Sequence, residues 1–122
     1  MIIPQTEWLV PTEYPDLRSA EEIAIDLETR DPDLKKLGSG AITSNGEVVG
    51  IAVAVDGWKG YFPIAHEIGP NLDRKKVLDW FTDVCSSPAT KIFHNAMYDV
   101  CWIRNLGIKI NGLIVDLSLI HI

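Results

Sequence analysis

Cationic residues are scarce in this sequence of 122 residues. Lysine and arginine number 11 against 17 aspartates and glutamates, so the formal net charge is −6 at pH 7. A domain that grips duplex nucleic acid through its phosphates is normally basic. The excess of acidic residues argues against direct binding of duplex phosphates. It favours an acidic site that relies on metal ions, or on a larger partner domain, to bind a polyanion.

Cysteine is scarce too, and no long hydrophobic run is present. Cys85 and Cys101 show neither a CxxC motif nor a Cys/His grouping at zinc-ligand spacing, so we expect small apolar core residues. The longest nearly unbroken apolar run, Val48–Val55, is too short to cross a membrane, and no cationic stretch precedes an apolar one at the N-terminus. We therefore expect a soluble, cytoplasmic protein with no membrane partner.

A hydrophobic content of 47% over this length is enough for one packed core and too little for a second domain. Residues 1–20 hold three of the seven prolines and have no sustained period. We predict an N-terminal extended arm over 1–20, with one short strand at 8–10, and a regular fold from residue 21.

Changes of hydrophobic period place the remaining elements. Ile23–Glu28 alternates and predicts a strand, a polar loop follows over Thr29–Asn45, and Asp56-Gly57 is a strong hairpin signal. Further strands are predicted at Gly46–Val55, Trp58–Ile64 and Lys91–His94, and a bent extended element over Ile108–Val115. Helices are predicted at Asn71–Cys85, with Asn71 or Asp73 as the cap, and at Ala96–Leu106, followed by Gly107 as a left-handed residue. The order βββαβαβ predicts an α/β fold with a mixed sheet and helices on its faces.

Two carboxylates stand out on the first predicted strand. Asp26 and Glu28 are two positions apart, so both side chains point to one face, as two oxygen ligands of a hard divalent cation must. The alternative is a solvated polar face. The apolar residues before the pair indicate a central strand, where like charges repel unless a cation lies between them.

A second pair, Asn95 and Asp99, begins at a strand end and runs into a helix, so that both side chains share one helical face. The simpler interpretation is a capping Asn followed by an acidic first turn. With Asp26 and Glu28, Asp99 would also complete a three-carboxylate pocket for Mg²⁺ or Mn²⁺.

These residues carry a resemblance to a known superfamily. IAIDLET and FHNAMYD resemble the first two motifs of the DEDD exonucleases, which have the ribonuclease H-like (DnaQ-like exonuclease) fold. DLETRDPDLKKLGSG, GEVVGIAVAV and CWIRNLGIKINGLIVD resemble the N-terminal proofreading domain of family A DNA polymerases of T7-like bacteriophages. The resemblance implies that residues 21–116 are a partial 3′-to-5′ exonuclease domain that acts on the single-stranded 3′ end of DNA. A polymerase domain in cis and the host cytoplasm are implied with it.

By the same resemblance, Asp26, Glu28 and Asp99 are catalytic ligands of two Mg²⁺ or Mn²⁺ ions, roughly 4 Å apart in the complete domain, which hydrolyse the 3′-terminal phosphodiester. The family also needs a fourth carboxylate in a Tyr-x-x-x-Asp or His-x-x-x-Asp motif. None follows Asp116, which itself has neither Tyr nor His four residues before it.

Four further residues are expected around this centre. Thr29 and Leu34 would contact the 3′-terminal nucleotide, through the backbone amide and by packing on the base, although Leu34 is equally suited to anchoring its loop. Asn95 is assigned to the substrate side. Asp116 is expected to support the ligands rather than bind metal directly.

The last six residues, 117–122, depart from the family. One back-translation, CTG TCT CTT ATA CAC ATC, resembles a transposon mosaic-end adaptor used in some sequencing libraries, so our hypothesis is a non-native, adaptor-derived tail; the competing interpretation is an authentic helix start. Either way the C-terminal helices are missing. We expect this chain to be weakly stable, to expose apolar sheet surface and to have little activity alone.

Two other functions stay open. A free-standing DEDD ribonuclease of the ribonuclease D or oligoribonuclease kind would share the same three carboxylates. A non-catalytic nuclease-fold module would have no metal site. The segment GIKINGLIVD and the loop after the first motif favour the polymerase exonuclease.

Overall fold

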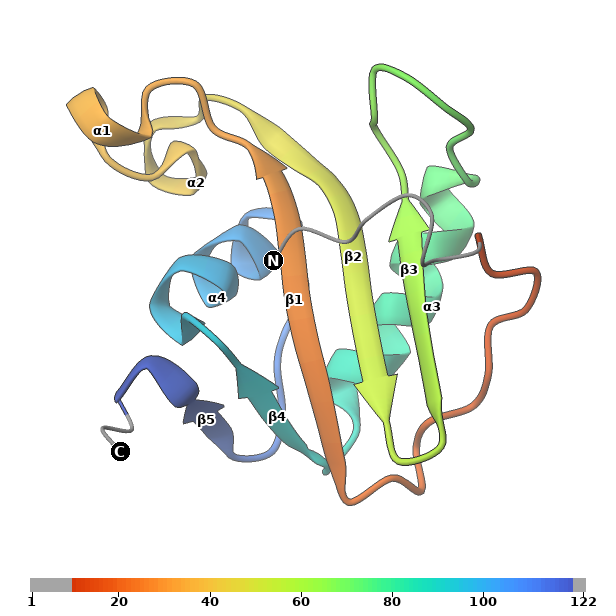
Figure 1. Cartoon of the computed structure of the whole chain (residues 1–122). Coiled ribbons are helices and arrows are strands. Elements are labelled where there is room, and N and C mark those ends of the chain that lie inside the picture. The colour runs from red at the N-terminus through yellow and green to blue at the C-terminus, as the bar shows by residue number, and fades with distance from the viewer. Residues whose placement is uncertain (1–9, 120–122) are drawn as a thin grey trace.

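The computed structural model describes residues 10–119, which form a five-stranded mixed sheet with helices against it (Figure 1). The strands lie in the order β3-β2-β1-β4-β5. Their bounds are β1 Glu22–Arg30, β2 Glu47–Val55, β3 Trp58–Pro63, β4 Thr90–Phe93 and β5 Ile114–Asp116. β1 pairs antiparallel with β2 and parallel with β4, so it is the central strand, as the sequence predicts.

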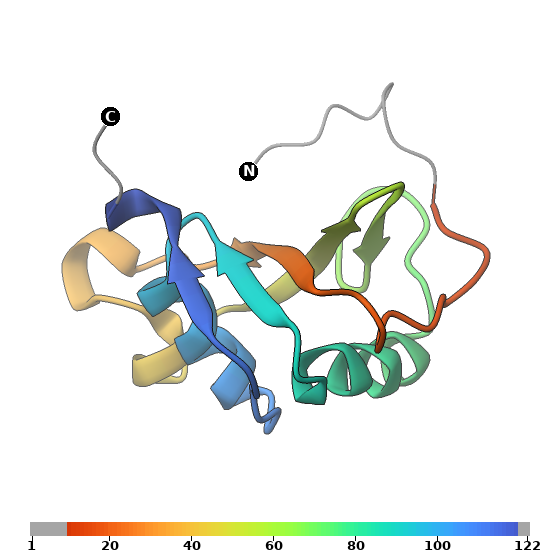
Figure 2. The ribbon, with the colours of Figure 1, turned by 90° about the horizontal axis from the view of Figure 1, so that it is seen from below.

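The two long helices, α3 Arg74–Ser86 and α4 Ala96–Asn105, lie on the same side of the sheet (Figure 2). Among residues 10–119, the predicted helices on the sheet are thus present, with both long helices on one face. On the opposite, open face, Ala54, Ala24, Ile92 and Val115 form one cross-strand row. Three of these four, Ala54, Ala24 and Ile92, line a shallow depression together with residues of the arm, and Asp26 and Glu28 lie farther along the same face.

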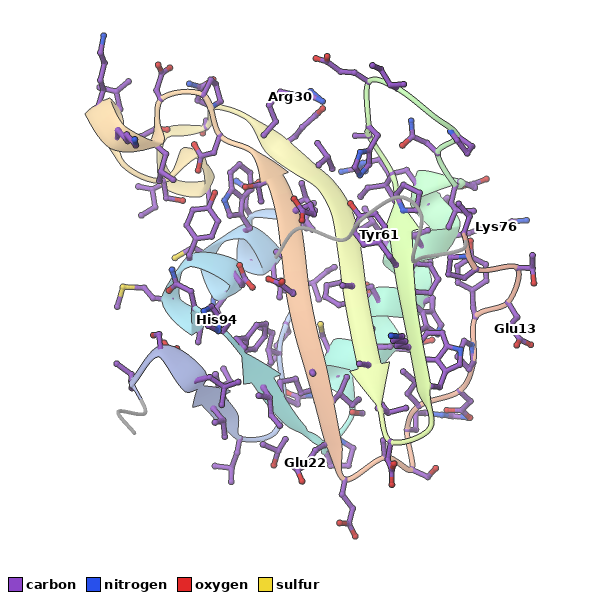
Figure 3. The ribbon with its side chains drawn as sticks, viewed as in Figure 1. Glu13, Glu22, Arg30, Tyr61, Lys76 and His94 are labelled. Carbon is purple, nitrogen blue, oxygen red and sulfur yellow. The ribbon has the colours of Figure 1, made fainter. Side chains whose placement is uncertain are left out.

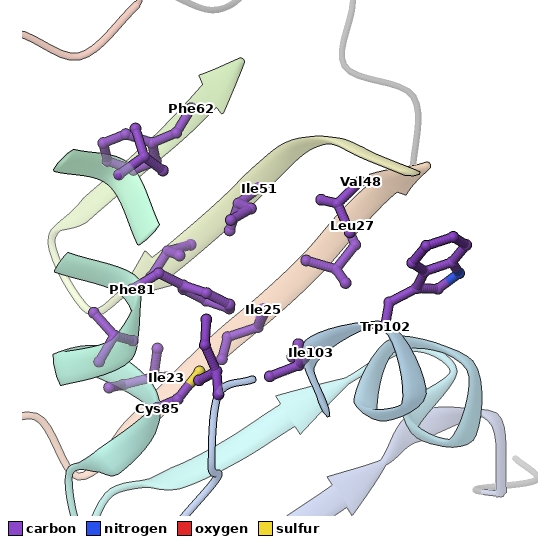
Figure 4. Packing of buried hydrophobic residues seen from close by; sticks show 14 of the residues in the cluster. Ile23, Ile25, Leu27, Val48, Ile51, Phe62, Phe81, Cys85, Trp102 and Ile103 are labelled. Atoms are coloured by element: carbon purple, nitrogen blue, oxygen red, sulfur yellow. The ribbon is translucent and has the colours of Figure 1, made fainter. Parts of the chain in front are cut away.

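The core lies between β1, β2, β3 and the two helices, and Figure 4 shows part of it. Ile23, Ile25 and Leu27 alternate inward from β1 and are at most 6% exposed. Their partners include Ile51 and Phe62. Each such side chain contributes on the order of 1.5–3 kcal/mol through burial, which fixes the face on which the alternate residues of β1 remain.

Aromatic rings attach the arm to this core. Phe62 and Trp80 pack with ring centroids 4.5 Å apart, and Tyr14 stacks on Phe62 at 5.7 Å. Trp80 Nε1 also donates a hydrogen bond to the Pro15 carbonyl at 2.8 Å. Residues 8–9 of the strand predicted in the arm lie outside the described residues, and residues 10–20 contain no strand.

The predicted loop over Thr29–Asn45 is more ordered than expected. β1 continues through Arg30, and two one-turn helices follow, α1 Leu34–Leu37 and α2 Gly40–Thr43. The cause is tertiary: Asp31 accepts from the Gly40 amide at 3.0 Å. Such a bond leaves no periodic signal in the sequence.

The sequence signals for helix ends predicted the structure better than those for this loop. Asp73 caps α3 by accepting from the Lys76 amide at 3.2 Å, one of the two caps predicted. Gly107 follows α4 with a φ of +82°, as predicted for a left-handed residue after a helix. Beyond residue 116, Leu117–Leu119 form a short 3-10 turn, and residues 120–122 of the predicted tail lie outside the described residues.

The bent extended element predicted over Ile108–Val115 is only partly present, because a strand forms at Ile114–Asp116 alone. In the segment before it, backbone amides donate instead to carbonyls near the C-terminal ends of α4 and α3. Ile108 N–H donates to the Ile103 carbonyl at 3.2 Å, and Asn111 N–H donates to the Cys85 carbonyl at 2.9 Å. At Gly112 the connection then passes close to β4: φ is +81°, and an ideal Cβ would lie 2.2 Å from the Ala89 carbonyl oxygen.

We expect Gly112→Ala to destabilise the chain more than Gly107→Ala. Both positions have a positive φ, which costs an alanine about 1–2 kcal/mol, but a Cβ at Gly107 meets open space. The steric overlap at Gly112 should add about 1–3 kcal/mol. Urea unfolding of both variants checks this. Equal losses in the free energy of unfolding would show that the β4–β5 connection can shift to accommodate the methyl group at no cost.

Candidate metal centre

Asp26 and Glu28 lie on the open face of the sheet, because the inward alternation of β1 leaves them there. A register shift follows at once: Glu28 pairs with Gly50, whereas Thr29 pairs with Val48. Such irregularities increase the local twist of a strand and are frequent beside active sites. The two predicted carboxylates are therefore on one face at an irregular point of the central strand.

Asp99 approaches the same strand from the other side. β4 ends at Phe93, the register partner of Ile25, so β1 has no parallel neighbour beyond that point. The first turn of α4 occupies the space, and its Asp99 side chain, 4% exposed, hydrogen-bonds the backbone of Leu27. Beyond the end of β4, the neighbour of β1 on this side is thus a carboxylate from a helix, next to the two carboxylates of β1 itself.

Asn95 precedes α4 but does not cap it with its side chain, which corrects the predicted cap. Only its carbonyl takes part, by accepting from the Asp99 amide at 3.2 Å. The Asn95 side chain is exposed. Its role on the substrate side remains a prediction.

Burial dominates the electrostatics of the site. It raises the pKa of Asp99 to about 7, and the negative charge of Asp26 adds to the rise. Burial likewise raises the pKa of Glu28, again with a contribution from Asp26. The negative charge of Asp26 therefore disfavours ionisation of both Glu28 and Asp99, and a nearby cation would offset this effect.

Two carboxylate oxygens in this site are buried without a hydrogen-bond partner: Glu28 Oε1 and Asp99 Oδ2. A buried polar atom that lacks a partner costs about 1–3 kcal/mol, and more when it is charged. A divalent cation with oxygen ligands would satisfy both atoms and relieve the repulsion from Asp26. The residues present therefore fit a hard metal ion.

The pocket is not closed around such an ion. Between residues 10 and 119, no three His, Cys, Asp or Glu side chains are gathered tightly enough to form a metal-binding group. The three-ligand set Asp26, Glu28 and Asp99 remains a prediction with two unpaired oxygens in its favour.

Asp116 ends β5 opposite Phe93 and lies beside the start of α4. Its Oδ1 accepts from the amide and the hydroxyl of Ser118, at 2.9 and 2.6 Å, and these bonds lower its pKa. Its charge also raises the pKa of Asp99. The role predicted for Asp116, support of the metal ligands without direct metal binding, remains a prediction, and its position beside α4 is compatible with that role.

A hydrogen-bond network that the sequence did not reveal fixes the end of β1. The Tyr98 hydroxyl lies 2.8 Å from Thr29 Oγ1 and donates to Asp31 Oδ2, also at 2.8 Å. Tyr98 precedes Asp99 on α4, so the network ties the helix that supplies one carboxylate to the strand that supplies two. Thr29 takes part through its hydroxyl, while its predicted contact with substrate is through its amide.

Leu34 begins α1, where it is 43% exposed, and no residue of α1 is buried. Asp31 and Asp33 hold this segment instead, the latter by accepting from the Asn45 side chain at 2.5 Å. Leu34 therefore has little part in anchoring its loop. Its side chain is available for the predicted packing against a base.

Comparison with known proteins gives one sequence relative, and no family model matches the chain. A DNA-directed DNA polymerase of Pseudomonas phage M6 is 47% identical over an aligned stretch of 77 residues that covers 60% of this chain. The match covers 12% of that polymerase, so the chain spans a small part of its relative's length.

Solved structures of ribonuclease D from Trypanosoma brucei share the fold. A structure of the ribonuclease has a TM-score of 0.60 at 22% identity, and a structure of its complex with RNA U12 has a TM-score of 0.59 at 21% identity. Each match covers 84% of this chain and 32% of the ribonuclease. The predicted ribonuclease H-like α/β fold is confirmed. Of the helices between residues 10 and 119, none has the length and hydrophobicity that a bilayer crossing requires.

In the absence of metal, we expect the free energy of unfolding to fall as the pH rises from about 5 to 7. The folded-state pKa of Asp99, about 7, exceeds its ordinary value of 3.8, so over this interval the folded state retains a proton that the unfolded state has released. Stability present at lower pH is therefore lost on ionisation of the buried carboxyl.

Urea unfolding in EDTA at pH 5, 6, 7 and 8 measures this effect. Asp99→Asn should flatten the dependence and be more stable than the natural chain at pH 8. The exposed Asp83→Asn serves as the control and should retain the fall. An unchanged slope in Asp99→Asn would contradict the assignment.

Proposed function

We propose that this chain is the 3′-to-5′ exonuclease module of a DNA polymerase, acting on a single-stranded 3′ end. The observation that carries the proposal is the pair of buried, unpartnered oxygens, Glu28 Oε1 and Asp99 Oδ2, on elements of a ribonuclease D-like sheet. Structural carboxylates in a core are normally satisfied by donors. Carboxylates left without donors fit a site that is completed by cations.

Asp26, Glu28 and Asp99 would hold divalent ions, Mg²⁺ or Mn²⁺. When bound, such ions activate water and stabilise the oxygen that leaves during phosphodiester hydrolysis. Asp99 is held near the backbone of Leu27, and Tyr98 links its helix to Thr29. These contacts fix the helix-borne carboxylate relative to the two on β1, so the chain supplies positioning as well as charge.

The choice of DNA over RNA rests on the sequence relative. Identity of 47% to a phage DNA polymerase is far above the 21–22% to ribonuclease D, whose structural match supports the fold alone. The exposed apolar residues of α1, Leu34 and Leu37, offer surfaces on which bases of a single strand can pack. A ribonuclease remains the second candidate, since the carboxylates would be shared.

We expect the 122-residue chain to bind Mn²⁺ and Asp26→Ala to weaken that binding by roughly tenfold or more, because a carboxylate ligand is removed. Calorimetric titration at pH 8, where Asp99 is ionised, measures both affinities. Glu13→Ala, an exposed substitution in the arm, is the control. Absence of binding in the natural chain would favour the non-catalytic module.

In a longer protein that includes this chain, Asp99→Ala should reduce release of 3′ nucleotides from single-stranded DNA by roughly a hundredfold or more, since several kcal/mol of charge stabilisation are lost. Polymerisation should persist. Matched DNA and RNA oligonucleotides separate the two candidate enzymes: preferred degradation of RNA would overturn the polymerase assignment.

A further inference from the structure

Glu28 has an unusual neighbour across the sheet. Its register partner on β2 is Gly50, and opposite residues of antiparallel strands share a face with Cβ atoms about 4.5–5.5 Å apart. Gly50 has no side chain, but an ideal Cβ there would lie 1.8 Å from the hydroxyl oxygen of Tyr61. The Tyr61 hydroxyl therefore occupies the space of a residue-50 side chain, directly beside Glu28.

The strand register brings Tyr61 to this position. Tyr61, labelled in Figure 3, lies on β3 and pairs with Ala52, which pairs with Asp26. By this register the phenol shares the open face with both carboxylates of β1. Small residues at 50 and 52 let its ring lie over β2, where it is 4% exposed.

His66 fixes the phenol from the other side. Its Nε2 lies 2.5 Å from the Tyr61 hydroxyl, and the two rings meet edge to face with centroids 5.7 Å apart. Asn71 holds the backbone of His66 at both polar atoms: its Oδ1 accepts from the His66 amide at 2.8 Å, and its Nδ2 donates to the His66 carbonyl at 2.9 Å.

A third anchor connects this turn to the strand that bears the carboxylates. Arg30, two residues after Glu28, donates through Nη2 to the Ala65 carbonyl at 2.9 Å. The amides of Ile64 and Ala65 both donate to the Val49 carbonyl, at 2.9 and 3.1 Å. His66 is therefore held in a turn that is bonded to β1, β2 and Asn71, a more extensive anchoring than filling the core alone requires.

We propose that Tyr61 and His66 are positioning residues for Glu28, which hold its carboxylate in the orientation that a divalent cation requires. This inference rests on the proposed function. Tyr61 limits the space into which the Glu28 side chain can turn, and His66 keeps the hydroxyl of Tyr61 in that place. The unpaired Glu28 Oε1 is then retained for a cation instead of rotating to solvent.

The test measures Mn²⁺ affinity of the 122-residue chain by calorimetry at pH 8, together with urea unfolding of each variant. Tyr61→Phe retains the ring and removes only the hydroxyl, and we expect it to weaken Mn²⁺ binding about tenfold, as loss of a group that orients a metal ligand typically does. Tyr14→Phe makes the same chemical change on the helix side of the sheet and should leave the affinity unchanged.

Substitutions of His66 separate positioning from packing. His66→Leu should weaken Mn²⁺ binding, whereas His66→Gln keeps a side-chain hydrogen-bonding group for the Tyr61 hydroxyl and should restore most of the affinity. Gly50→Ala should also weaken binding, because its methyl group would displace the phenol. A role in stability alone would instead lower the free energy of unfolding without this pattern of affinities.

Two negative outcomes have different meanings. If the natural chain binds Mn²⁺ and Tyr61→Phe binds it equally well, the positioning role is overturned and the proposed function stands. If the natural chain binds no Mn²⁺, both proposals fail together.

Discussion

The early end of β4 is the constraint on which the arrangement of this site depends. β4 stops opposite Ile25, while β1 continues to Arg30, so one edge of the central strand lacks a strand partner over its last residues. Backbone groups on a buried strand edge require partners. In the first turn of α4, the Asp99 carboxylate meets the backbone of Leu27 on this edge, which places an acidic group against a strand that already carries Asp26 and Glu28.

The sequence predicted those site residues whose positions depend on neighbouring residues, and missed those whose positions depend on contacts distant in the chain. Asp26 and Glu28 were found because a period of two in a strand is visible in the sequence, and Asp73 and Gly107 because caps have local signatures. Tyr61 and His66 were missed because their place depends on strand register and on an absent side chain at Gly50. The helices after Arg30 were missed because side-chain contacts of Asp31 and Asp33, with Gly40 and Asn45, organise them.

Hydrogen bonds around the site connect elements that are distant in the chain. Tyr98 joins α4 to the end of β1, and Arg30 joins the end of β1 to the turn after β3. Both connections converge within two residues of Glu28. A strand that is held at this point from both sides can keep like-charged groups close together, because the scaffold, rather than the groups themselves, resists their separation.

The strand edges and the open face of the sheet differ in how readily they would contact a second molecule in solution. β5 has three residues, and the outer strand β3 ends in Pro63, which has no amide to donate, so neither edge is a good template for pairing with a second molecule. The two long helices of the described residues lie on the other face and leave the cross-strand row of Ala54, Ala24, Ile92 and Val115 uncovered by a helix. Any self-association of the isolated chain would therefore involve contact between sheet faces rather than strand pairing, and detergent would weaken it without disturbing the sheet.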